Sequence, residues 1–79
     1  MARQQTLAGW DRYGVTWCRK QGEAKVEITR LKNLDTGIIE WHGKVWTGRD
    51  RDRPVYQGFH GQDIYSCLER VNEEVDSAQ

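Results

Sequence analysis

The side chains that could act in catalysis or bind a metal are few and widely spaced in this chain. They are two cysteines and two histidines, Cys18, His42, His60 and Cys67. Glu40 and His42 point the same way if their segment is a strand, about 7 Å apart along it. No serine or cysteine is placed beside them to act as a nucleophile. A catalytic site needs a nucleophile next to a base, so we predict that the protein is not an enzyme.

Metal and nucleotide sites are not supported by the spacing of the same residues. Structural zinc sites use close pairs of ligands, and positions 18, 42, 60 and 67 contain none. The segment "GIIEWHGK" has five residues between its glycines where a phosphate-binding loop has four, and Val45 follows Lys44 where that loop has serine or threonine. We therefore expect no cofactor and no metal. Cys18 and Cys67 are expected as free thiols, with Cys67 buried and inert.

Length and composition predict one small domain. The chain has 79 residues, which allows one core. Residues 1–9 lack periodicity and are expected to be a flexible lead-in, with a single domain over 10–79. The start "MARQQTLAGW" has no apolar run, so we expect neither a signal peptide nor a membrane span, and a soluble, cytoplasmic protein. The eight aromatic residues are expected to supply much of the core volume.

Charge is balanced overall but not along the chain. There are 12 basic and 12 acidic residues, with +4 over residues 1–61 (11 basic, 7 acidic) and −4 over residues 62–79 (1 basic, 5 acidic). Dedicated nucleic-acid binders usually have a strong basic excess. The composition therefore favours other partners.

Hydropathy alternates with period two over four segments and then changes to a helical period. The strand-like segments are 10–18, 25–29, 37–48 and 54–59, separated by turn-forming residues. The helical apolar stripe consists of Ile64, Cys67, Leu68, Val71 and Val75. We predict an α+β fold, an antiparallel meander of three to four strands with one C-terminal amphipathic helix packed on one face (β-β-β-β-α).

The predicted third strand identifies the core side of the sheet. Its less polar face consists of Ile39, Trp41, Gly43 and Val45. Glycine in the middle of a strand indicates a bulge or the close approach of another part of the chain. We therefore expect Gly43 to mark one of these two features. In the second strand-like segment, Val26 and Ile28 share one side, and Lys25, Glu27 and Thr29 lie opposite.

The stretch "WTGRDRDRPVY", residues 46–56, is the most unusual in composition. If it is extended, Arg49, Arg51 and Arg53 lie on one edge and the two aspartates on the other. If it curls, the opposite charges neutralise one another as a solvated hairpin tip. Arginine without lysine favours the first alternative, because the guanidinium group grips carboxylates and phosphates with two hydrogen bonds.

Two surfaces are candidate binding sites. Trp46, Ile38 and Tyr56 are expected on the sheet face that the helix leaves uncovered, where Leu7 and Trp10 of the N-terminal segment either fold over them or leave them to a partner. The predicted partner-binding residues are Arg49, Arg51, Arg53, Trp46, Tyr56, Lys44 and His42. The second candidate is the acidic face of the helix, with Asp63, Glu69, Glu73 and Glu74.

The chain resembles two groups of proteins. "VYQGF", residues 55–59, leading into a helix resembles the ethylene-response type of DNA-binding domain, which implies a sheet face that reads DNA. In that position this chain has Glu27, Glu40 and His42. As a small aromatic-rich chain without a catalytic signature, it is also similar in type to phage-encoded inhibitors such as the anti-CRISPR proteins. This implies a host protein or complex as partner, often one that handles nucleic acid.

These observations give two functional expectations. The first is a non-enzymatic protein-binding module, an inhibitor of phage or mobile-element type that occupies a surface of a host protein complex. The alternative is a small nucleic-acid-binding domain that uses the exposed sheet face and the arginine loop. Neither expectation includes a membrane partner or an oligomeric state.

Overall fold

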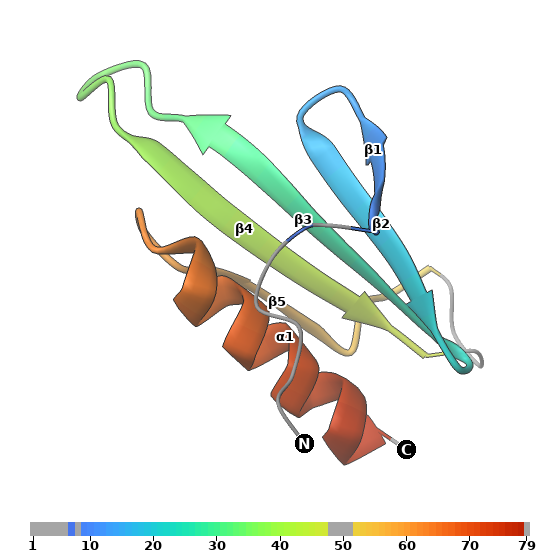
Figure 1. Cartoon of the computed structure of the whole chain (residues 1–79). Coiled ribbons are helices and arrows are strands. Elements are labelled where there is room, and N and C mark those ends of the chain that lie inside the picture. The colour runs from blue at the N-terminus through green and yellow to red at the C-terminus, as the bar shows by residue number, and fades with distance from the viewer. Residues whose placement is uncertain (1–6, 8, 48–51, 79) are drawn as a thin grey trace.

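A computed structural model describes residues 7, 9–47 and 52–78. The chain forms five strands followed by one helix (Figure 1). The elements are β1 (Asp11–Tyr13), β2 (Thr16–Gln21), β3 (Ala24–Lys32), β4 (Ile39–Trp46), β5 (Tyr56–Phe59) and α1 (Ile64–Ala78). In the part of the chain that the structure describes, no helix has the length and apolar character needed to cross a membrane.

The strands form one antiparallel sheet in the order β1-β2-β3-β4-β5. The predicted α+β meander with a C-terminal helix is confirmed, but it has five strands where three to four were expected. The first strand-like segment is divided by a tight turn at Gly14, which has a φ of +66°. This left-handed conformation favours glycine, and it turns one alternating run into two short antiparallel strands.

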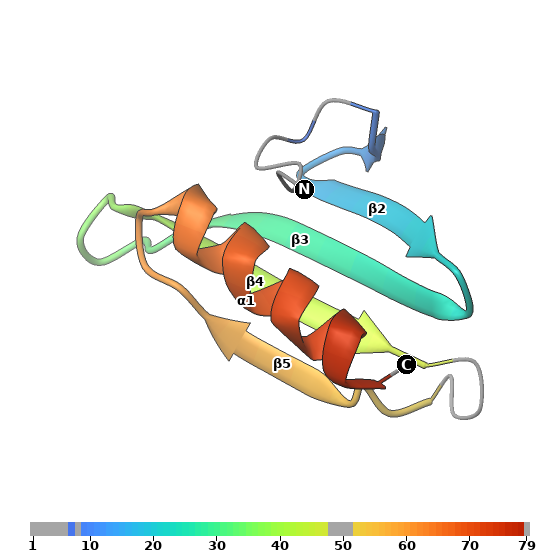
Figure 2. The same ribbon diagram turned by 60° about the horizontal axis from the view of Figure 1, so that its bottom comes forward.

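The helix covers one face of the sheet, over β3, β4 and β5 (Figure 2). Its predicted apolar stripe is confirmed: Cys67, Leu68, Val71 and Val75 are fully buried, and Ile64 packs against them. The sheet contributes Ala24, Val26, Ile28 and Val45 to the same cluster.

The core is aliphatic, and this corrects the expectation that aromatic side chains supply its bulk. All the buried core side chains among the described residues are Ala, Val, Ile, Leu or Cys. Trp10, Trp41 and Tyr56 pack around this cluster, whereas Tyr13 and Phe59 are 69% and 65% exposed. Small aliphatic side chains let the helix lie close to the sheet, and the large rings are left to line the border of the core.

Gly43 is the point of closest approach between helix and sheet. It pairs in register with Ile28 on one side and Gly58 on the other, so the strand has no bulge here. A Cβ atom at Gly43 would lie 2.7 Å from Val71 Cγ1 and 3.1 Å from Cys67 Sγ. Of the two features that the sequence allowed at this glycine, the structure has the close approach.

The described N-terminal residues lie on the helix side of the sheet. Leu7 and Trp10 pack against the buried cluster, and Arg19 lies 6.0 Å from the centre of the Trp10 ring. The opposite sheet face, here called the bare face, is therefore not covered by Leu7 or Trp10. The alternative in which these two side chains fold over that face is wrong, because the core offers them a larger apolar surface.

Candidate functional site

The bare face is a regular grid of mostly polar side chains that follows from the strand register. Directly paired residues on neighbouring strands point to the same side. One row across all five strands consists of Tyr13, Thr16, Thr29, His42 and Phe59. The next row consists of Asp11, Cys18, Glu27, Lys44 and Gln57. This alternation is typical of an antiparallel sheet with one solvated side.

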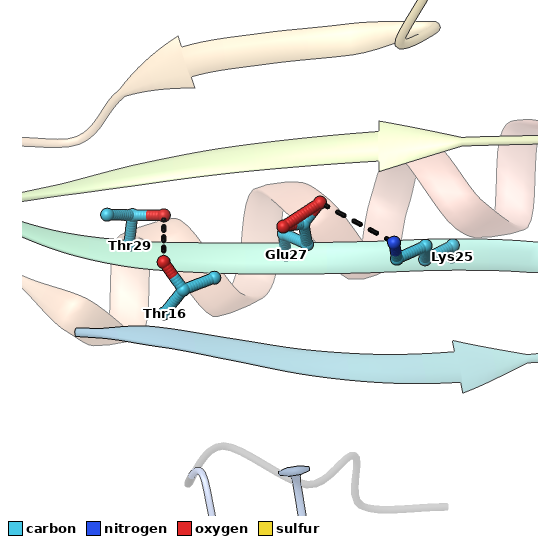
Figure 3. A network of polar contacts seen from close by, with 4 residues as sticks. All are labelled: Thr16, Lys25, Glu27 and Thr29. Atoms are coloured by element: carbon cyan, nitrogen blue, oxygen red, sulfur yellow. Dashed lines mark hydrogen bonds and ion pairs between the residues drawn. The ribbon is translucent and has the colours of Figure 1, made fainter. Parts of the chain in front are cut away.

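Neighbouring side chains of the grid contact one another. The hydroxyl groups of Thr16 and Thr29 form a hydrogen bond of 3.1 Å, and Lys25 forms an ion pair of 3.8 Å with Glu27, as Figure 3 shows with α1 behind the strands. The His42 ring stacks on Phe59 with centroids 4.5 Å apart. Toward β1 the same face has an open pocket lined by Asp11, Cys18, Lys25 and Glu27, among others.

The described members of the predicted partner-binding set lie on both sides of the sheet. Arg49 and Arg51 lie outside the described residues, and Arg53 is exposed beyond them. His42, Lys44 and Trp46 lie on the bare face as expected, where Lys25 Nζ sits 5.6 Å from the centre of the Trp46 ring. Whether the arginine stretch is extended or curled therefore depends on residues outside those that the structure describes.

Tyr56 is a correction, because it lies on the helix side of the sheet. It pairs with the fully buried Val45 and packs against the core. Its ring lies under the guanidinium group of Arg70 at 5.0 Å, and its hydroxyl group hydrogen-bonds His60 Nε2 at 2.7 Å. Ile38 is likewise not on the strand face but in the β3–β4 loop. Period two predicts which strand residues share a side, but not which side the helix will cover.

The acidic residues of the helix divide between structural and exposed positions. Asp63 caps the start of α1, where its carboxylate accepts hydrogen bonds from the backbone N–H of Tyr65 (2.9 Å) and the hydroxyl of Ser66 (3.0 Å). These hydrogen bonds lower the pKa of Asp63. Glu74 forms an ion pair of 2.9 Å with Arg70. Glu69 and Glu73 are exposed, so this predicted face is reduced to two solvated carboxylates.

The surroundings of both histidines disfavour the charged form of the imidazole ring. Burial, followed by the charges of Lys44 and His60, lowers the pKa of His42. Burial, followed by the charge of Arg70, lowers the pKa of His60. Near neutral pH the two rings are therefore predominantly neutral, and His60 can accept or share the Tyr56 hydroxyl proton.

We predict that stability decreases on mild acidification because of these histidines. A histidine whose folded pKa lies below the unfolded value of 6.5 binds more protons when unfolded. Its contribution to stability is complete above the unfolded pKa and is lost as the pH falls below it. Urea unfolding at about pH 7.5 and about pH 5.5 should show the loss, and the double variant His42→Gln/His60→Gln should show a smaller one. Equal losses in both proteins would contradict this assignment.

Neither cysteine provides an activated nucleophile. Burial raises the pKa of Cys67 to about 12, and burial together with Glu27 raises the pKa of Cys18. Both are free thiols, on opposite sides of the sheet. Within residues 7, 9–47 and 52–78, no group of three or more histidine, cysteine or carboxylate side chains is arranged to hold a metal ion.

A surface that the sequence patterns did not reveal lies at one end of the sheet. Nine large hydrophobic side chains are exposed among the described residues. Val55 lies near the end where β4 leads to β5. The other eight are spread across the sheet toward the opposite end, which carries the β1–β2 turn, the β3–β4 loop and the start of α1 (Figure 1). We call this the apolar end: Tyr13, Val15, Leu31, Leu34, Ile38, Ile39, Phe59 and Tyr65.

The β3–β4 loop presents Leu34 on an ordered support. Asn33 Oδ1 accepts hydrogen bonds from the backbone N–H groups of Asp35 (2.9 Å) and Thr36 (3.3 Å). The backbone of Asn33 also bonds to Ile38 and Gly37, and Gly37 has a φ of +74°. Leu34 is nevertheless 91% exposed. The exposure of Leu34 could be predicted from the sequence only if the protrusion of the β3–β4 loop were already known.

Comparison with known proteins adds no relative to this description. No family model, no curated protein and no solved structure matches the chain.

Proposed function

We propose that the protein is a binding module that recognises another protein through the apolar end. The observation that carries the proposal is the position of eight of the nine exposed large hydrophobic side chains at one end of the sheet. Single exposed apolar residues are ordinary on a protein surface, but a concentration of them marks an interaction site. Burial of such side chains is the main driving force of protein association.

Leu34 is the proposed anchor of this surface. It is the most exposed of the eight side chains, so a partner can enclose it from several sides. Its loop is already ordered by the side chain of Asn33, so little conformational entropy is lost on binding. Tyr13 and Phe59, at the two edges of the sheet, add exposed aromatic area, and aromatic side chains are enriched at protein interfaces.

Occupation of a partner's surface is sufficient for inhibition, and an inhibitor of the phage type remains the finer form of this proposal. The alternative function, nucleic-acid binding through the bare face, has less support. That face carries Lys20, Lys25 and Lys44 against Asp11, Glu27 and Glu40, so its positive and negative charges are equal in number. Phosphate binding requires a positive excess.

The proposal is tested by comparing capture of proteins by the natural chain and by Leu34→Asp. Both are immobilised and exposed to a lysate of cells that encode the chain, and bound proteins are quantified by mass spectrometry. We expect a partner that the natural chain enriches and that Leu34→Asp captures about tenfold less, because a buried carboxylate at an interface centre is not paired.

Val55→Asp is the matched control, because Val55 is 51% exposed at the other end of the sheet. It should capture the partner as the natural chain does. Equal capture by Leu34→Asp and the natural chain would contradict the proposal. Sedimentation analysis of the isolated chain provides a second check: self-association abolished by Leu34→Asp would replace the foreign partner with a second copy.

A further inference from the structure

The helix side of the sheet carries a line of side chains that alternate in chemistry. Arg12 pairs with Trp17 across β1 and β2, and Arg30 pairs with Trp41 across β3 and β4. Trp17 pairs with Ile28, two residues before Arg30, so the two pairs adjoin diagonally. The order across four strands is therefore cation, aromatic, cation, aromatic, over about 14 Å at the usual strand spacing.

Ring contacts join three of these four side chains, Arg12, Trp17 and Trp41. The Arg12 guanidinium carbon lies 4.9 Å from the centre of the Trp17 ring, and Arg12 Nε donates a hydrogen bond to the carbonyl oxygen of Gly14 at 2.9 Å. The Trp17 and Trp41 rings have centroids 5.7 Å apart and planes inclined by 52°. Arg12 and Arg30 are themselves exposed. The guanidinium group of Arg12 is thus oriented before any ligand binds.

The charge of this side is one-signed on the strands. The helix-side positions of β1 to β4 carry Arg12, Arg19, Arg30 and Lys32, and these described strands have no carboxylate on that side. Lys32 pairs with Ile39 of the apolar end, so the cations continue directly into that surface. We call Arg12, Trp17, Arg30, Trp41 and Lys32 the cationic strip.

We propose that the cationic strip binds an acidic segment of the partner protein that docks on the apolar end. This inference rests on the proposed function and adds the chemistry of the partner. Guanidinium groups bind carboxylates with paired hydrogen bonds, and a tryptophan beneath one limits its motion and its hydration. The cations adjoin the apolar end. Charges of one sign beside an apolar anchor fix the orientation in which a partner of opposite charge docks, and they speed its association.

An acidic peptide fits the strip better than a nucleic acid. Bases bind by stacking on free aromatic faces, but one side of the Trp17 ring is occupied by Arg12 and the ring also contacts Trp41.

The test measures binding of a fluorescein-labelled peptide in which glutamate and serine alternate over about ten residues, by fluorescence anisotropy at low salt. A peptide with glutamine in place of glutamate and an oligothymidine of about ten nucleotides are compared with it. We expect the glutamate peptide to bind the natural chain and to lose about tenfold in affinity with Arg12→Glu/Arg30→Glu. Lys20→Glu/Lys44→Glu, on the bare face, changes the net charge equally and should leave the affinity within about twofold.

Equal losses of affinity in the two double variants would contradict the proposal that the cationic strip binds an acidic segment. Binding of the glutamine peptide with the same affinity as the glutamate peptide would contradict it as well. Tighter binding of the oligothymidine would replace the peptide with a single-stranded nucleic acid. Leu34→Asp should bind the glutamate peptide as the natural chain does, because Leu34 is not part of the strip. Failure of the peptide with loss of capture in Leu34→Asp therefore removes only this inference. The reverse result removes the proposed function and leaves of the inference only the affinity of the cationic strip for acidic peptides.

Discussion

Leu68→Ala should lower the free energy of unfolding by about 2–5 kcal/mol, whereas Leu34→Ala should change it by less than about 0.5 kcal/mol. The substitution is the same, but Leu68 is fully buried between helix and sheet and Leu34 is 91% exposed. Truncation at Leu68 removes apolar contacts and leaves a cavity. At Leu34 the lost methyl groups are in water in both the folded and the unfolded chain.

Urea unfolding followed by tryptophan fluorescence measures both values. A domain of this size has a total stability of about 3–5 kcal/mol, so Leu68→Ala can leave too little folded protein for a baseline. Ile28→Val, at a fully buried position of β3, is then the milder variant, with an expected loss of about 0.5–1.5 kcal/mol. If Leu34→Ala lowered the free energy of unfolding as much as Leu68→Ala, the β3–β4 loop would have to pack inward. That result would contradict the exposure on which the apolar end is defined.

Gly43→Ala should destabilise the protein by about 1–3 kcal/mol, although alanine usually replaces strand glycine without loss. The added methyl group would meet Val71 Cγ1 at 2.7 Å and Cys67 Sγ at 3.1 Å. Both atoms belong to fully buried side chains of α1, which cannot turn toward solvent. The helix must move away from the sheet, and contacts along the whole apolar stripe are weakened.

A double-mutant cycle separates this clash from a general preference for glycine. Val71→Ala removes the atom nearest to the added methyl group, so Gly43→Ala should cost less in that background than in the natural chain. Val75→Ala is the control, because Val75 is equally buried but is not among the atoms nearest to a Cβ at Gly43. Equal coupling energies with Val71 and Val75 would contradict the close approach.

The elements of this fold were predictable because each depends on local spacing. The apolar stripe that ends at Val75 indicated which side chains of α1 share one face, and the alternation of Val26 and Ile28 did the same for β3, since side-chain direction follows the backbone period. These side chains are the ones buried in the core. Division of the first run at Gly14 was missed, because Tyr13, Val15 and Trp17 alternate as one strand would. The positive φ that breaks the run leaves no trace in the hydropathy pattern.

The candidate surfaces were predicted less well than the elements. The composition of the chain predicted a binding site in the arginine stretch of residues 46–56. The apolar end, in contrast, consists of side chains from β1, β3, β4, β5, α1 and the connections between them. Leu34 and Ile38 stand in a loop whose residues are typical of turns, and only the protrusion of that loop exposes them. Tyr56 was assigned to the wrong face because the side that the helix covers is chosen by packing.

An antiparallel sheet with one C-terminal helix was predictable from the sequence, because periods of two and 3.6 residues are typical of strand and helix. The sequence also determined that Gly43 requires close contact or irregular backbone. The alignment of Arg12, Trp17, Arg30 and Trp41 across four strands became visible only in the folded protein, as did the exposure of most large hydrophobic side chains toward one end of the sheet. Contacts between distant segments depend on strand register and on the face that the helix covers, and both are set by the packing of the whole chain.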